Sequence, residues 1–210
     1  SVVACHDADD EALFVAREIR QHARTTPYAH MSVLLRLTAH SRAFESIFHR
    51  LNIPYRLLGG VRFFDRAEVR DLLAYLTLAD NPAYTPAVLR VLNVPKRGIG
   101  PQSAQQLAAA AQHAQVPLLT HLAHAHALRP ALLRAVRSFV DVVHELHAQR
   151  HAPVADLLHR VLHLTRYEEH LRQTSDADAR WDHVQELIHL ATASDDLSSF
   201  LESSALASDV

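Results

Sequence analysis

The chain has 210 residues, with 21 Lys and Arg, 23 Asp and Glu, and a formal net charge of −2 at pH 7. This length permits a sizeable hydrophobic core, either in one large domain or in one domain with part of another. The near-neutral charge excludes binding to nucleic acid through a uniformly basic surface, so any such binding must be local. A single cysteine, Cys5, excludes an internal disulfide, and no apolar run reaches membrane-spanning length.

The first 59 residues alternate short apolar runs with helical patterns. Strands are expected at residues 2–4, 31–35 and 55–58, and helices at residues 12–19 and 39–51. This order predicts an α/β unit with a parallel sheet, in which ligands gather at the carboxyl ends of the strands. Arg36 and Thr38 follow the second strand at that edge. Because three strands make a thin sheet, the α/β unit is expected to be partial.

From residue 60 onward the patterns are helical only. A helix is expected between Asp65 and Asn81, and the others are expected at residues 86–92, 101–114, 117–125, 130–149, 153–164, 177–193 and 197–207. The predicted fold class is therefore α/β plus all-α. The predicted domains are residues 1–59, the α/β part, and residues 60–210, a helical domain.

The stretch around two closely spaced glycines, Gly98 and Gly100, is the most informative one. Pro95 ends one helix and Pro101 suits the first turn of the next, which predicts two helices joined by a tight hairpin. Backbone N–H groups at such a hairpin, beside the positive end of a helix dipole, form a seat for one phosphate. The candidate phosphate-binding residues are Lys96, Arg97, Gly98, Ile99, Gly100 and Ser103, with Ile99 pinning the hairpin to its helices. The alternative is an ordinary helix–helix turn.

Two histidine pairs, His147/His151 and His159/His163, have the i, i+4 spacing of metal ligands. With seventeen histidines in the chain, pairs at this spacing are expected by chance. No metal site and no catalytic residue is predicted.

Several runs of the first half of the chain occur in the order and spacing of one family. They are residues 33–42, 53–56, 59–71, 73–76 and 90–100, the last being Arg90-Val91-Leu92-Asn93-Val94-Pro95-Lys96-Arg97-Gly98-Ile99-Gly100. Together they resemble the superfamily 1 DNA helicases of the UvrD/PcrA/Rep type. The resemblance implies that residues 1–59 are part of the RecA-like motor domain 2A, and that residues 60–210 are its helical insertion, 2B.

The resemblance also implies roles for individual residues. Arg36 falls on the arginine of motif IV, which contacts the tracked single strand, whereas Thr38 stands where the family has asparagine. The hairpin Gly98-Ile99-Gly100 matches the 2B element that grips the duplex ahead of the fork. Ser103 stands where family members often have threonine.

The implied function is that of a fragment of an ATP-dependent 3′–5′ DNA helicase. Its partners would be single-stranded and duplex DNA, domains 1A and 1B, and the rest of 2A, with ATP and Mg²⁺ bound by the full-length protein and no membrane involved. An intracellular location is expected, either cytoplasmic at the nucleoid in a bacterium or nuclear or organellar in a eukaryote. The alternative is a non-catalytic DNA-binding or protein-interaction module derived from a helicase.

We predict that the 210-residue chain alone does not hydrolyse ATP. Lys96 is the only lysine and follows a proline, so the phosphate-binding sequence Gly-x-x-x-x-Gly-Lys-Ser/Thr does not occur. Phosphate release by the purified chain, with DNA added, checks this. Activity above a buffer blank that co-purifies with the chain through two columns would contradict it.

Overall fold

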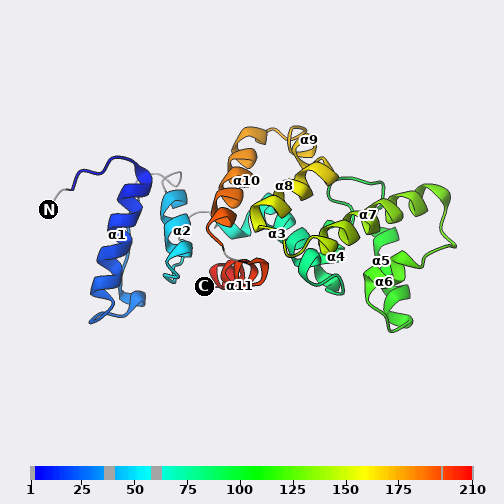
Figure 1. Ribbon diagram of the computed structural model, residues 1–210, viewed down its shortest axis with the longest axis horizontal. Helices are drawn as coiled ribbons and strands as arrows, with labels where there is room; N and C mark the ends of the chain where they lie inside the picture. Colours follow the sequence, from blue (N-terminus) through cyan, green and yellow to red (C-terminus); the bar gives the residue numbers. More distant parts are fainter. Residues whose placement is uncertain (1–2, 36–40, 58–62, 195, 210) are drawn as a thin grey trace. The chain divides into compact units, whose positions relative to one another are not determined.

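The computed structural model describes residues 3–35, 41–57, 63–194 and 196–209. All secondary structure in these ranges is helical (Figure 1). The chain forms two compact units, one of residues 1–66 with 202–210 and one of residues 67–201. The predicted domain boundary between residues 59 and 60 lies outside the described residues.

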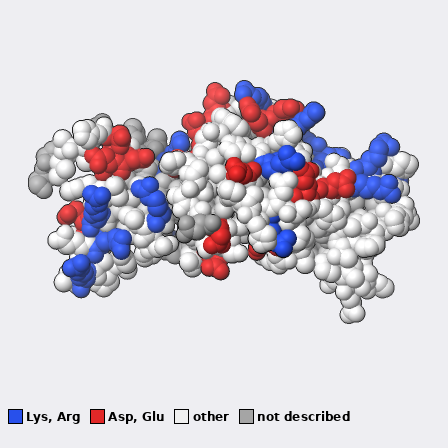
Figure 2. Space-filling model, in the orientation of Figure 1, with Lys and Arg blue, Asp and Glu red and all other residues white. Residues whose placement is uncertain are grey.

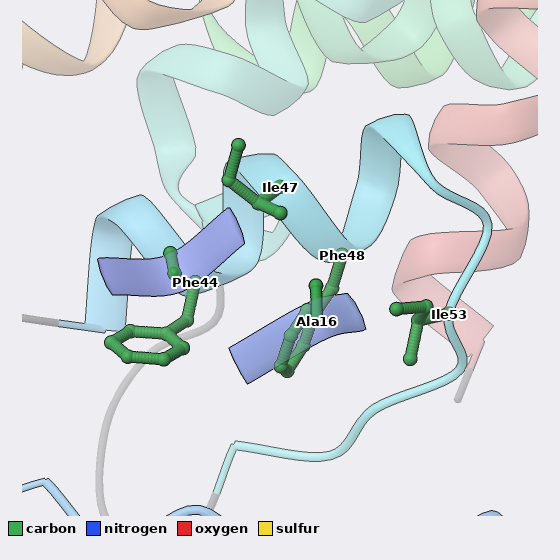
Figure 3. Close-up of a cluster of buried hydrophobic side chains, with 6 residues drawn as sticks. Ala16, Phe44, Ile47, Phe48 and Ile53 are labelled. Atoms are coloured by element: carbon green, nitrogen blue, oxygen red, sulfur yellow. The ribbon is translucent and has the colours of Figure 1, made fainter. Parts of the chain in front are cut away.

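The first unit is built around two helices, α1 (Ala8–His22) and α2 (Ser41–Arg50). The carboxylate of Asp7 accepts a hydrogen bond from the backbone N–H of Asp10 at 2.8 Å and so caps the start of α1. Alanines of α1 face the aromatic side of α2, where a small side chain lets the helices approach (Figure 3). The buried cluster consists of Ala12, Ala16, Phe44, Ile47, Phe48 and Ile53. Two short 3-10 helices, η1 (Tyr28–His30) and η3 (Phe63–Asp65), also belong to this unit.

The predicted strands are wrong for the residues that the structure describes. Residues 3–4, 31–35 and 55–57 form no strand, although Met31 has extended backbone angles, φ −109° and ψ 146°. A strand requires a neighbour that pairs with its N–H and C=O groups, and none of the described segments is such a neighbour. Val33 and Leu34, within the second expected strand, are 36% and 94% exposed. The described residues therefore contain extended apolar segments in place of the predicted partial RecA-like sheet.

The second unit is a helical domain whose central element is α3 (Ala67–Asp80). Nine of the residues of α3 are buried, as expected for a helix that is covered on nearly all sides. Four helices pack against it: α4 (Thr85–Val91), α7 (Pro130–Ala148), α8 (Val154–Thr165) and α10 (Ala177–Thr192). The others are α5 (Pro101–His113), α6 (Leu118–Ala123), α9 (Tyr167–Leu171) and α11 (Leu197–Asp209), of which α11 continues into the first unit.

Most of the predicted helices are confirmed. The start of α5 and α7 at Pro101 and Pro130 was expected because proline is preorganised for a first helical turn. The short helix α9 was not predicted; it follows Arg166, whose left-handed backbone (φ 52°) ends α8 without a glycine in the sequence to mark it. None of the helices in the described ranges is both long enough and apolar enough to cross a bilayer.

We predict an acid-sensitive contribution of His49 to stability. The His49 ring packs on Phe64 with 4.6 Å between ring centroids, and its Nε2 atom is buried. Burial lowers the pKa of His49 to about 4, against the opposing effect of a hydrogen bond with the backbone at Ser203. The unfolded chain therefore binds a proton near pH 6.5 while the folded chain does not. The contribution is fully present above pH 6.5 and is lost as the pH falls towards 4, by up to about 3 kcal/mol.

Urea denaturation of a His49→Gln variant at pH 7 and pH 5 measures this contribution. Between pH 7 and pH 5, the free energy of unfolding should fall by about 2 kcal/mol less in the variant than in the unchanged chain. A His151→Gln variant, at an exposed histidine, serves as the control. Equal pH dependence of the His49 variant and the unchanged chain would show that this imidazole is not kept neutral by burial.

Candidate nucleic-acid interface

The predicted hairpin joins α4 to α5 through residues 92–100, which confirms the expectation of two helices and a tight connection. Gly98 has φ +81°, a left-handed conformation that glycine adopts without strain. Gly100 is the N-cap of α5, with φ −67° and ψ 162°, and Pro101 follows as the first helical residue. Both glycines are exposed, whereas Ile99 between them is 1% exposed. The buried isoleucine thus holds the hairpin against the domain, as predicted.

Asn93 organises the hairpin from within. Its side-chain oxygen accepts hydrogen bonds from the backbone N–H groups of Arg97 (2.7 Å) and Ile99 (3.1 Å). These two bonds hold the chain in a tight turn between Asn93 and Ile99. They also give acceptors to two backbone N–H groups that lie outside any helix. Sequence reasoning did not single out Asn93, although asparagine beside glycine and proline is a common turn signal.

The side chain of Arg97 points into the domain. Its Nη1 atom donates to the carbonyl oxygens of Val91 and Pro95, both at 3.1 Å, and its Nη2 atom donates to the Tyr75 hydroxyl at 2.6 Å. The guanidinium carbon lies 5.5 Å from the centroid of the Phe139 ring on α7, within cation–π range. Most of the donors of Arg97 are therefore engaged inside the loop.

Tyr75 completes this network from the core of α3. The side chain is fully buried, and its hydroxyl donates to the carbonyl oxygen of Val94 at 2.5 Å while accepting from Arg97. Burial raises the pKa of Tyr75 to about 12, against the opposing effect of the Arg97 charge. The hydroxyl thus keeps its proton and serves as a fixed link between helix and loop.

A second buried network fixes the helix that leads into the hairpin. The Asp71 carboxylate of α3 accepts a hydrogen bond from the Tyr167 hydroxyl at 2.9 Å and pairs with Arg90 of α4 at 2.8 Å. Arg90 also donates to the carbonyl oxygen of Ala67 at 3.1 Å. Burial raises the pKa of Asp71, and the hydrogen bonds and the Arg90 charge oppose that effect. Asp71 thus joins α3, α4 and α9.

The outer side of the hairpin presents unpaired donors. Among the described residues, none accepts a hydrogen bond from the backbone N–H groups of Gly98, Gly100, Gln102 or Ser103. A Cβ atom built on either glycine would meet nothing within 4 Å, so the surface in front of these donors is open. The positive end of the α5 dipole lies at the same place, and Lys96 is exposed beside it. This arrangement suits one oxyanion.

The remaining predicted site residues are placed as follows. Ser103 lies half-buried in the first turn of α5, near the hairpin glycines. Arg36 and Thr38, predicted to contact a single strand, lie outside the described residues. The hairpin thus exposes Lys96, Gly98 and Gly100 ahead of Ser103, whereas the side chain of Arg97 is engaged within the loop.

We predict that Tyr75→Phe destabilises the chain by about 1–3 kcal/mol. Loss of the hydroxyl leaves the Val94 carbonyl and one donor of Arg97 buried without a partner. Urea denaturation measures the change. Tyr84→Phe, at a tyrosine that is 49% exposed, is the matched control and should change stability by less than about 0.5 kcal/mol. If both variants unfolded like the unchanged chain, the network would not hold the loop.

Sequence comparisons bear on this site. Residues 1–209 match the family described as UvrD-like helicase C-terminal domain. The chain is 35% identical over 191 residues to the ATP-dependent DNA helicase UvrD1 of Mycobacterium tuberculosis (strain ATCC 25618 / H37Rv). This alignment covers 87% of this chain and 25% of that protein. It is 33% identical over 175 residues to the ATP-dependent DNA helicase PcrA of Staphylococcus aureus (strain NCTC 8325 / PS 47), which covers 81% and 24%. The chain spans about a quarter of the length of these curated relatives.

Proposed function

This chain belongs to the UvrD-like helicase C-terminal domain family, and we propose that it grips duplex DNA for an ATP-dependent DNA helicase. The proposed contact is the hairpin of residues 92–100 together with the first turn of α5. The observation that carries the proposal is the set of unpaired backbone N–H groups at Gly98, Gly100, Gln102 and Ser103, open to the surface and next to Lys96.

Binding at this site is independent of base sequence. Backbone N–H groups and a lysine bind phosphate oxygens, which are the same at every base pair. The α5 dipole favours the negative charge of the phosphate, and Lys96 adds a full positive charge. A grip of this kind suits a protein that moves along DNA.

Arg97 stabilises the hairpin from within the loop and does not contact the phosphate. Because its guanidinium binds the Val91 and Pro95 carbonyls and the Tyr75 hydroxyl, we assign Arg97 to holding the loop in shape and Lys96 to the direct phosphate contact. This division differs from the prediction that both side chains face the phosphate.

The proposal extends to the rest of the helicase. Arg36 and Thr38 contact the tracked single strand, and residues 1–59 are part of a RecA-like motor domain. ATP and Mg²⁺ are assigned to other parts of the full-length protein, because the Gly-x-x-x-x-Gly-Lys-Ser/Thr sequence does not occur in this chain. ATP hydrolysis belongs to domains 1A and 1B and the rest of 2A.

We predict that Gly100→Asp weakens duplex binding while leaving the fold at least as stable. Backbone angles at Gly100 are open to any residue, and an N-cap aspartate would accept hydrogen bonds from the N–H groups of Gln102 or Ser103. Stability should rise by a few tenths of a kcal/mol to about 1 kcal/mol. The carboxylate takes the place of the phosphate and repels it, so duplex affinity should fall at least about tenfold.

Fluorescence anisotropy with a labelled 20-base-pair duplex at low salt measures binding, and urea denaturation measures stability. Ser175→Asp adds the same charge at an exposed turn of the same unit and should bind like the unchanged chain. Duplex binding by Gly100→Asp equal to that of Ser175→Asp would overturn the hairpin assignment.

A further inference from the structure

The charges of this chain are segregated along the sequence. Residues 81–140 contain no Asp or Glu, so all 23 acidic residues of the chain lie in the other 150 positions. The same stretch contains six basic residues, Arg90, Lys96, Arg97, Arg129, Arg134 and Arg137. It comprises α4, α5, α6 and the first half of α7, all in the second unit. Although the whole chain has a net charge of −2, residues 81–140 therefore carry only positive charges.

Two of these six cations have structural partners. Arg90 pairs with Asp71, and Arg97 is engaged within the hairpin loop. The side chains of Lys96, Arg129, Arg134 and Arg137 form no ion pair or hydrogen bond with any residue in the described ranges. All four residues are exposed. On the face shown in Figure 2, blue side chains gather over the start of α7, and red ones border them towards the middle of the helix.

Folding alone does not account for the three arginines of α7. Arg129 is the N-cap of α7 and the first turn has no acidic residue, so the positive end of the helix dipole faces positive side chains. Arg134 and Arg137, at i and i+3, share one side of the helix with Cβ atoms about 5–6 Å apart, where like charges repel. Repulsion between these arginines opposes helix stability. Asp141, four residues after Arg137, offsets part of it, and an anion bound beside Arg134 would relieve more.

Helix α1 provides the contrast. Its exposed Arg17 and Arg20 have the same i, i+3 spacing, but Glu18 lies between them and the first turn carries Asp9, Asp10 and Glu11. That pattern is the ordinary mixed surface of a solvated helix.

We propose that Arg129, Arg134 and Arg137 form a second phosphate-binding surface, the α7 arginine face, which binds the backbone of duplex DNA. This inference rests on the proposed function of the hairpin, since both surfaces would engage one duplex. Arg129 to Arg137 spans about 12 Å of helix axis. A rigid duplex presents one phosphate per strand every 3.4 Å of its axis, so the face can reach about two or three phosphates.

A duplex fits this face better than an acidic protein segment does. Arginine binds phosphate oxygens through two parallel N–H donors, and guanidinium groups fixed on a helix suit a partner whose charges have a regular, rigid spacing. With the hairpin alone, the plot of log K against log salt should have a slope of about −2 to −3. With the α7 arginine face as well, the slope should approach about −4 to −5.

The experiment compares anisotropy titrations of a 20-base-pair duplex between 50 and 200 mM salt for the unchanged chain, Arg134→Gln/Arg137→Gln, Gly100→Asp and Arg17→Gln/Arg20→Gln. The α7 double variant should bind about tenfold more weakly at 50 mM salt, with a slope less steep by about 2. The α1 double variant has the same charge change and the same spacing, and should bind like the unchanged chain. Circular dichroism melts establish that each variant is folded.

The outcomes separate the two surfaces. Equal binding by the α7 double variant and the unchanged chain, with loss only in Gly100→Asp, would overturn the α7 arginine face and leave the hairpin standing. Loss in the α7 variant with none in Gly100→Asp would overturn the hairpin assignment instead. Equal loss in the α1 and α7 variants would reduce the effect to net charge and overturn the inference. Displacement of the duplex by polyglutamate as readily as by unlabelled duplex would also overturn it, by indicating an acidic protein partner.

Discussion

The hairpin depends above all on the guanidinium of Arg97. Residues 92–97 belong to no helix, so their carbonyl groups lack the partners that a helix supplies, and Arg97 and Tyr75 provide them from within the domain. A guanidinium suits this role because it is planar, carries five donors and stays charged throughout the usual pH range. Asn93 fixes the opposite side of the same loop. The exposed glycines are therefore held in place by buried side chains from α3 and the loop itself.

Sequence alone predicts the helices of this chain well because residues close to each helix end determine where the helix begins and ends. Pro101 and Pro130 start helices, and apolar spacing identifies the buried faces. The direction of Arg97 could not be predicted, because it is set by Tyr75, which lies 22 residues earlier, and by Phe139 on α7. The strand predictions failed for a related reason. Apolar runs such as 31–35 report a preference for extended backbone, whereas a strand exists only where a neighbouring segment pairs with it.

Total charge was a poor guide to where this chain can bind an anion. A net charge of −2 argues against a uniformly basic protein, yet residues 81–140 contain no carboxylate. The paired cations and the unpaired ones in this stretch have different roles. Arg90 and Arg97 connect helices and loop, while Lys96 and the arginines of α7 face solvent. Electrostatic attraction to a polyanion depends on the local field within about one Debye length, so segregation of this kind matters more than the sum.

The backbone conformation requires glycine at one of the two hairpin positions but not at the other. Gly98 has φ +81°, where any other residue would be strained, so the fold itself accounts for it. Gly100 has ordinary backbone angles, and a Cβ atom there would meet no other part of the domain. Serine, asparagine or aspartate at this N-cap would stabilise α5 slightly more than glycine does. The fold therefore gives no reason for glycine at position 100. The phosphate that we propose to bind at the free N–H groups of α5 would give one, because a side chain would occupy its place.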